Sequence, residues 1–357
     1  MFFGFNGCFI YHRRRFNGRW WVYGALKRLR IFISGNGVTI MKIEAFFRSR
    51  TGIVVASVIA TILWGSAFPF IKLSYRELGI QQGDVYQQIL FAGYRFTLSG
   101  LIIICFMSVN RQRIALVPST LKRIVRVSLV QTFLQYLFIY IGLSRSSSAV
   151  GSITSGAISF FQLILAHFLF KEDQLNPKKM VGIVFGFMGL ILLFSKGDHT
   201  FQFGSGDILL FCGAFSASLG NILSKVESRH ISVFYLNAYQ MLLGGIALIC
   251  ISSWKIGIIP FHFETKSMLL LLYLSMVSAV SFILWNYLLK CNPVGKVSMY
   301  MFLVPLFGVG WSMLLLHEHI QKLIWVSLVL VISGIIIVNR DFTEKKVNIY
   351  GSRSRKY

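Results

Sequence analysis

The stretch Val294–Val338 decides the fold, because it forms a pattern that the chain holds twice. It consists of two apolar segments, Val297–Leu316 and Leu323–Val338, joined by the polar turn His317–Lys322. The first has about 20 residues and the second about 16, close to the ~20 that a helix needs to cross ~30 Å of hydrocarbon. The stretch therefore predicts a hairpin of two membrane-spanning helices.

The earlier copy of this pattern is Ala149–Ser195. Glu172 lies twenty residues after Ser152, just as Glu318 lies twenty residues after Ser298. A repeat that covers half of a chain is typical of transporters built from two structural repeats around a central site.

The composition limits the class of protein. The chain is 55% apolar and 13% charged, with long apolar runs, which excludes a soluble domain, a disordered chain and the short alternating segments of a β-barrel. The net charge of +24 comes from cations between apolar runs rather than on a soluble basic surface, so no nucleic-acid partner is expected. The cysteines show no metal or redox spacing, and no metal or cofactor is predicted.

We predict an all-α integral membrane protein with ten transmembrane helices in two inverted five-helix repeats, 52–195 and 207–339. The connections are short, which leaves no room for a soluble domain. The spans are expected at 52–74, 86–107, 124–143, 149–170, 178–195, 207–225, 233–253, 267–289, 296–316 and 322–339.

The distribution of Lys and Arg predicts the orientation. The connections and tails assigned to one side carry 28 of the 36 cations, and those on the other side carry six. Because cytoplasmic loops hold the excess of cations, both termini should be cytoplasmic in the cell (inner) membrane. Five spans in each half make the second repeat enter from the opposite side, so the repeats should be inverted.

The tails are basic. Residues 1–51 are expected to be a cytoplasmic segment lying on anionic lipid, and residues 340–357 a basic cytoplasmic tail. An equal alternative is that translation starts at Met41, so that residues 1–40 are not translated.

From about residue 52 to 340 the chain resembles the EamA-type transporters of the drug/metabolite transporter superfamily. The resemblance implies a ten-helix carrier, usually an exporter of amino acids or other small metabolites, that works by alternating access without ATP. Two positions depart from the pattern, Ser159 for a frequent proline and Ala217 for a frequent tryptophan. The motifs that carry the resemblance are Leu63-Trp64-Gly65-Ser66, Tyr94-Arg95-Phe96, Phe170-Lys171-Glu172, Ala217 with Asn221, Leu284-Trp285-Asn286-Tyr287, Pro305, Glu318 and Gly334.

Trp64, Gly65 and Pro69 lie within the first span, and Pro305 lies in the ninth. Proline removes a backbone hydrogen bond and glycine admits a neighbouring helix, so these residues predict either a hinge or close helix packing. In the hinge hypothesis Trp64 faces the cavity.

Arg95 lies near the middle of the second span, where an isolated charge costs at least ~2.5–3.5 kcal/mol. It could pair with a substrate carboxylate or phosphate. The slightly favoured alternative is a structural cation bonded to carbonyl groups of a neighbouring helix.

Glu172 and Glu318 lie at corresponding helix ends, where gating through salt bridges to Lys178, Lys179 or Lys322 competes with the favoured structural capping. None of the twelve acidic residues lies near the centre of a span, so the carboxylate relays of proton-coupled pumps are missing from the sequence.

Polar side chains within the spans outline an expected substrate pathway at the bilayer midplane, although each one alone is more often a contact between helices. Ser155, Ser159 and Gln162 share one helical face. With Trp64 and Arg95, the predicted pathway comprises Gln131, Gln135, Ser155, Ser159, Gln162, Asn221, Gln240, Ser281, Trp285 and Tyr300.

These observations favour a secondary transporter that moves a small metabolite, such as an amino acid, outward across the bilayer. The alternative is a membrane protein that is not a carrier, such as a lipid scramblase or scaffold. No span holds a catalytic Ser/His/Asp set or paired carboxylates, so an enzyme is not expected. The sequence leaves open whether the chain forms a homodimer.

Overall fold

The computed structural model describes residues 37–81, 83–145, 148–194, 204–316, 325–326 and 328–338. Every regular element in these ranges is a helix. A bilayer offers no partner to an open backbone N–H or C=O group, and a helix satisfies these groups within its own segment.

Each predicted span overlaps a helix. Two differences stand out: the third helical run begins at Pro118 rather than near 124, and a short helix, α2, was not predicted. Glu318 and parts of both tails lie outside the described residues. The helices are α2 (Gly37–Arg48), α3 (Arg50–Leu78), α4 (Val85–Val109), α5 (Pro118–Val127), η2 (Ser128–Leu134), α6 (Gln135–Leu143), α7 (Ser148–Leu169), η3 (Lys171–Asp173), α8 (Pro177–Phe194), α9 (Ser205–Glu227), α10 (Val233–Ile256), α11 (Thr265–Cys291), α12 (Val294–Ser298), η4 (Met299–Phe302), α13 (Leu303–Leu316) and a last helix, Leu328–Val338.

Within the described residues, 7 helical runs are long and apolar enough to cross a membrane. They are α3, α4, the continuous run Pro118–Leu143, α9, α10, α11 and the run Val294–Leu315. Two shorter apolar stretches, Gly156–Leu169 and Leu328–Val338, accompany them.

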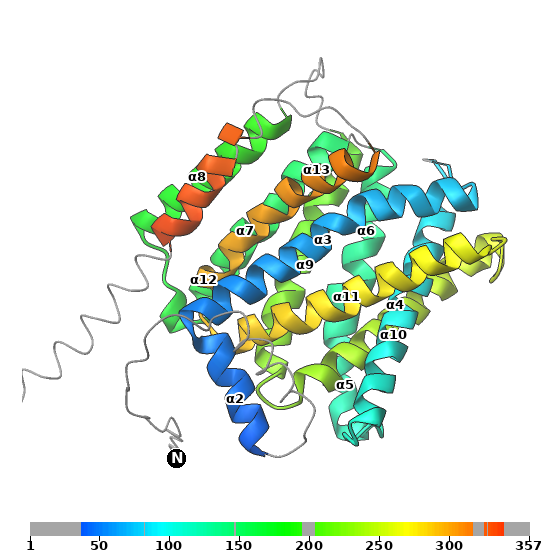
Figure 1. The fold of residues 1–357 in the computed structure, drawn as a ribbon, viewed down its shortest axis with the longest axis horizontal. Coiled ribbons are helices and arrows are strands. Elements are labelled where there is room, and N and C mark those ends of the chain that lie inside the picture. The colour runs from blue at the N-terminus through cyan, green and yellow to red at the C-terminus, as the bar shows by residue number, and fades with distance from the viewer. Residues whose placement is uncertain are drawn as a thin grey trace, which may run out of the picture.

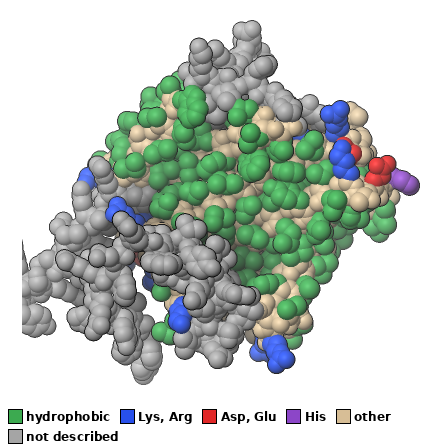
Figure 2. All heavy atoms as spheres, viewed as in Figure 1, with side chains coloured by type: hydrophobic (Ala, Val, Ile, Leu, Met, Phe, Trp, Pro, Cys, Tyr) green, Lys and Arg blue, Asp and Glu red, His purple; other side chains and the backbone are tan. Residues whose placement is uncertain are grey.

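The outer surface of the helices is apolar and the interior holds many polar groups. Hydrophobic side chains cover most of the face seen in Figure 2, and charged side chains lie towards its edges. Inside, small hydroxyl groups bond back to their own helix, as Ser278 does to the carbonyl of Leu274 and Ser281 to that of Val277. Such residues let helices approach without leaving a polar group unpaired.

The two halves of the chain interdigitate instead of forming separate bundles. Helix α4 packs along α10, and α3 lies against both α11 and α13 (Figure 1). In the same way α9, from the second half, packs against α6 and α7 of the first half. Each half therefore has its first helix embedded in the other half.

Glycines bring α4 and α10 into backbone contact. A Cβ atom on Gly100 would lie 2.7 Å from the carbonyl oxygen of Ala238, and one on Gly93 would lie 2.9 Å from the amide nitrogen of Ile249. On the opposing helix, a Cβ atom on Gly245 would lie 2.5 Å from the amide nitrogen of Thr97. No larger residue fits at these three positions without moving a helix.

Two spans are irregular where the sequence predicts plain helices. The run Pro118–Leu143 contains the π-helical segment η2, and the run Val294–Leu316 contains the 3₁₀ turn η4 just before Pro305. Pro305 itself lies in the first turn of α13, where its missing N–H costs little. By contrast, α3 continues through Pro69 without interruption.

Gly65→Ala should destabilise the protein by about 1–3 kcal/mol, because the added methyl group would overpack the contact of α3 with α13. Its Cβ would lie 2.7 Å from the Cβ of Phe307 and 2.8 Å from the amide nitrogen of Gly308. Thermal unfolding in detergent measures the effect. The matched control is Gly310→Ala in α13, whose Cβ would have no neighbouring atom within 4 Å and should cause no loss. Equal melting temperatures for the two variants would contradict this packing.

Candidate functional site

Three buried amide side chains from three helices form the centre of the candidate site. Nε2 of Gln131, in η2, donates a hydrogen bond of 2.7 Å to Oδ1 of Asn221 in α9. Nδ2 of Asn221 lies 3.5 Å from Oε1 of Gln162 in α7. Asn221 therefore bridges the two halves of the chain, and all three residues were predicted from the sequence.

Two further buried polar pairs involve α10 and α11. Thr132, next to Gln131 in η2, donates to Oε1 of Gln240 in α10. One helical turn away on α10, Oδ1 of Asn237 accepts a hydrogen bond of 2.7 Å from Nδ2 of Asn286 in α11. We call the set Gln131, Gln162, Asn221, Asn237, Gln240 and Asn286 the amide network.

The amide network has unused hydrogen-bonding capacity. Oε1 of Gln131 and Oδ1 of Asn286, both buried, have no hydrogen-bond partner among the described residues. The same holds for Nε2 of Gln162, Nε2 of Gln240 and Nε1 of Trp285. A buried polar atom without a partner costs about 1–3 kcal/mol, so the contacts between helices do not fully satisfy these side chains.

Two predicted tryptophans from different halves of the chain pack against each other. The rings of Trp64 in α3 and Trp285 in α11 pack edge to face with centroids 5.4 Å apart, and Phe282 lies 5.4 Å from Trp64 on the same side. Trp285 is fully buried, while Trp64 is half-buried. The contact joins α3, from the first half, to α11, from the second.

The end of the bundle that carries α2 is here called the α2 end. The network is displaced from the predicted midplane towards this end. Asn221 is six residues before the end of α9, and Gln240 is seven residues after the start of α10. At 1.5 Å per residue, both are about 10 Å from the helix termini at the α2 end.

Arg95 lies apart from the network and is only 3% exposed. Its Nε donates to Oγ of Ser278 at 2.7 Å and to the carbonyl oxygen of Leu274 at 3.3 Å, both in α11. These bonds are the ones expected of a structural cation. Within the described part of the chain, however, no acceptor pairs with its terminal Nη1 and Nη2 atoms and no carboxylate forms an ion pair with it. The guanidinium lies over the ring of Phe96, with Cζ 5.3 Å from the centroid, and Tyr136 and Tyr140 of α6 are near it.

The remaining predicted residues have structural contacts or lie out of view. Oγ of Ser159 donates to the carbonyl oxygen of Ser298, linking α7 to α12. Gln135, Tyr300, Pro69 and Pro305 are buried. The side chain of Ser155 lies outside the described residues, as Glu318 does.

Glu172 is exposed, and the residue after it makes the contacts that the sequence analysis assigned to Glu172. Asp173 is fully buried, and its Oδ1 lies 3.9 Å from Nζ of Lys179. Sequence reasoning missed Asp173 because two adjacent acids at a helix end look alike until the fold buries one of them. The only signal was the position of the pair at the turn between two predicted spans.

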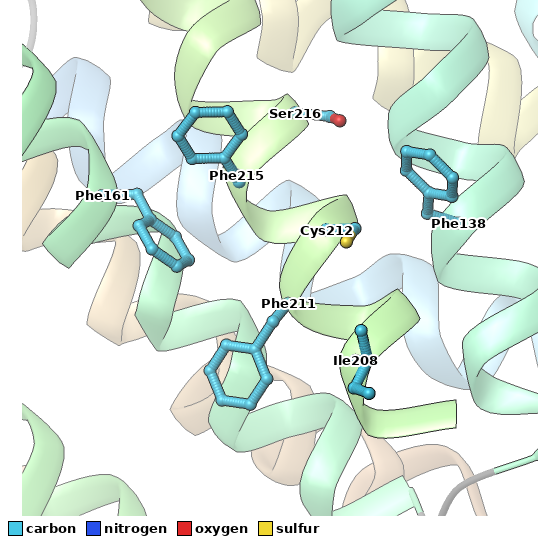
Figure 3. A pocket seen from close by; sticks show the side chains of 7 residues that line it. All are labelled: Phe138, Phe161, Ile208, Phe211, Cys212, Phe215 and Ser216. Atoms are coloured by element: carbon cyan, nitrogen blue, oxygen red, sulfur yellow. The ribbon is translucent and has the colours of Figure 1, made fainter. Parts of the chain in front are cut away.

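Two cavities in the described structure open elsewhere. One, of about 450 Å³, lies between α6, α7 and α9 and is lined by the aromatic rings of Phe138, Phe161, Phe211 and Phe215 (Figure 3). The other, of about 830 Å³, lies between α4, α6 and α10. Neither is lined by a residue of the predicted pathway.

Comparison with known proteins identifies the chain. The EamA-like transporter family matches residues 50–195 and again residues 204–340. The chain belongs to the EamA-like transporter family. The resemblance drawn from the sequence is thereby confirmed.

Relatives of this EamA-like protein carry transporter names. It is 22% identical over 300 residues to the uncharacterized transporter YoaV of Bacillus subtilis, covering 83% of this chain and 99% of the relative. It is 25% identical over 325 residues to the "Probable amino-acid metabolite efflux pump" of Escherichia coli, covering 85% and 96% of the two chains. A protein of known crystal structure shares the fold with a TM-score of 0.68 at 15% identity, covering 81% of this chain and 96% of the other.

The family and the helices together settle the class of protein. The chain is a multi-pass helical membrane protein of a transporter family, not an enzyme. Its partners are accordingly a small-molecule substrate and the surrounding lipid.

Arg95→Lys should lower the stability of this EamA-like protein by about 1.5–3 kcal/mol. Lysine keeps the charge but has no donor at the position of Nε, so the carbonyl of Leu274 and the hydroxyl of Ser278 lose a charged partner. Thermal unfolding in detergent would show the loss. Arg76→Lys, at the exposed end of α3, is the control and should melt like the wild type.

Proposed function

We propose that the protein is a secondary carrier that exports a small zwitterionic metabolite, such as an amino acid, by alternating access. The observation that carries the proposal is the amide network, which is shared by both halves and retains unpaired polar atoms. A network that only joined helices would use its donors and acceptors within the protein.

The chemistry of these atoms suits a zwitterion. Nε2 of Gln162, Nε2 of Gln240 and Nε1 of Trp285 are donors for a carboxylate. Oε1 of Gln131 and Oδ1 of Asn286 are acceptors for an ammonium group. The name of the Escherichia coli relative, an amino-acid metabolite efflux pump, supports the same substrate class and an outward direction.

The proposed architecture is ten transmembrane helices in two inverted repeats, 52–195 and 207–339. The family matches the chain twice, over 50–195 and 204–340, which supports the two repeats. The helix contacts support a two-fold relation between the repeats because they occur in corresponding pairs. The first helix of each half packs in the same way: α3 packs on α11 and α13, and α9 packs on α6 and α7. The second helices of the two halves, α4 and α10, pack on each other.

An inverted pair of repeats places one site between two halves that can rock about it. We place the carrier in the cell membrane with both termini cytoplasmic, on the basis of the Lys and Arg distribution, so that the α2 end faces the cytoplasm. A homodimer is compatible with this arrangement, and no step of the proposed cycle requires one.

A lipid scramblase or scaffold is the second candidate. A scaffold needs no polar groups between its halves, and its interior would be expected to pack apolar side chains there. Here the fully buried Gln162, Gln240 and Asn286 occupy that position instead, which favours a carrier.

Flux of radiolabelled metabolites into proteoliposomes tests the proposal, with separate pools of amino acids, organic acids and nucleosides. The amino-acid pool should move down its gradient. Gln162→Leu and Gln240→Leu should each reduce the flux by about tenfold or more, because each removes a donor that the ligand would use. Gln112→Leu, outside the spans, is the matched control and should transport normally.

Two results would contradict this assignment. If no pool moves while fluorescent lipid exchanges between leaflets, the scramblase takes the place of the carrier. If Gln162→Leu and Gln240→Leu fold and transport like the Gln112→Leu control, the amide network is not the substrate site.

A further inference from the structure

Asp173 forms a buried contact between the two halves at the α2 end. It lies in η3, the turn between α7 and α8 of the first half, and its side chain is fully buried. Its carboxylate accepts hydrogen bonds from the backbone N–H groups of Val294 at 2.7 Å and Gly295 at 2.9 Å, the first two residues of α12. The carboxylate therefore caps a helix of the other half.

Lysines from two further helices surround this carboxylate. Nζ of Lys179 in α8 lies 3.9 Å from Asp173 and donates to the carbonyl oxygen of Gln174 at 2.7 Å. Nζ of Lys225 in α9 donates to the carbonyl oxygen of Asn292, two residues before Val294, at 2.6 Å. Burial raises the pKa of Asp173, and the two N–H donors and both lysines oppose that rise.

The contact extends to α2 and towards the amide network. Nδ2 of Asn292 donates to the carbonyl oxygen of Phe47 in α2 at 2.8 Å. On the other side, the space next to Gly295 is bounded by Asp173 and by Leu163, which directly follows Gln162 in α7. Figure 1 shows α2 and α12 at the same end of the bundle. Because Gln162 is seven residues before the end of α7 and Asp173 follows that end, the carboxylate lies closer to the surface of the α2 end than Gln162 does.

We propose that Asp173 is the gate residue of the α2 end: its carboxylate holds α12 closed over the amide network, and its release opens that network to the cytoplasm. The inference rests on the alternating-access function proposed above. The carboxylate of this gate lies in the turn η3, outside the spans predicted from the sequence.

The physical basis is that the closed contact is all or none. A buried carboxylate is tolerated only while donors and cations satisfy it, and separating it from α12 leaves an unpaired charge and two unpaired N–H groups. Water must then enter the α2 end to hydrate them. Opening of the gate and hydration of that end are therefore one event, as a two-state gate requires.

Cys291 provides a reporter for this event. It is the last residue of α11, directly before Asn292, and it is 8% exposed. In a background with Cys8, Cys105, Cys212 and Cys250 changed to serine, the rate of alkylation of Cys291 by N-ethylmaleimide measures exposure of the α2 end. Asp173→Asn should raise that rate on the order of tenfold, because the amide keeps the shape but loses the charged acceptor.

The neighbouring acid supplies the matched control. Glu172, the residue before Asp173, has an exposed side chain, and Glu172→Gln removes a carboxylate charge there. Cys291 in this variant should be alkylated at the wild-type rate. The inference is overturned if Cys291 is alkylated at the wild-type rate in Asp173→Asn, or if Glu172→Gln speeds its alkylation as much as Asp173→Asn does.

A second variant leaves every charge in place and serves if Asp173→Asn does not fold. A Cβ atom on Gly295 would lie 3.1 Å from both Oδ1 of Asp173 and Cδ2 of Leu163, so Gly295→Ala should displace the capped helix and also speed alkylation. A wild-type rate in folded Gly295→Ala would count against the gate. Alkylation needs no substrate, so its outcome is separate from that of the flux assay. If the amino-acid pool does not move but Asp173→Asn speeds alkylation of Cys291, the proposed substrate is rejected and the proposed gate is retained.

Discussion

The close contact of α4 with α10 is the constraint on which the rest of the structure depends. Between helices in lipid there is no hydrophobic driving force, so association relies on backbones that approach closely. Gly93, Gly100 and Gly245 allow this approach, since a Cβ atom at each would meet the backbone of the opposing helix within 2.9 Å. Because α4 and α10 belong to different halves, this one contact makes the halves interdigitate and places α3 and α9 inside the opposite half.

The burial of polar side chains inside the bundle follows from that arrangement. Side chains that would be costly in lipid are enclosed at two levels, Arg95 with its tyrosine neighbours at one and the amide network at the other. Arg95 is held by α11 through Nε alone, which leaves its terminal nitrogens directed at no described acceptor.

The sequence predicted the positions of individual helices because the length of an apolar run is a local property: 207–225 was expected for α9, and Ser205–Glu227 is observed. Seven of the ten predicted spans are long and apolar enough to cross a membrane within the described residues. It also selected Gln131, Gln162 and Asn221, since amides in lipid-spanning helices must face protein. It did not predict the π-helical turn η2 or the pairing of these amides, which depend on neighbouring helices. Nor could it separate Asp173 from Glu172, because only the packing of α12 buries one of them.

Charged side chains make contacts at both ends of the bundle. At the α2 end, buried Glu227 pairs with Arg123 and Arg126, in addition to the Asp173 contact. At the opposite end, the contacts between α3 and α11 among the described residues include the neutral bond of Ser66 with Tyr273 and the exposed pair of Glu77 with Lys266. Neutral bonds and exposed pairs contribute about 0–1.5 kcal/mol each, whereas breaking a buried ion pair leaves an uncompensated charge. The buried contacts of Asp173 and Glu227 therefore contribute to holding the α2 end in the conformation described here.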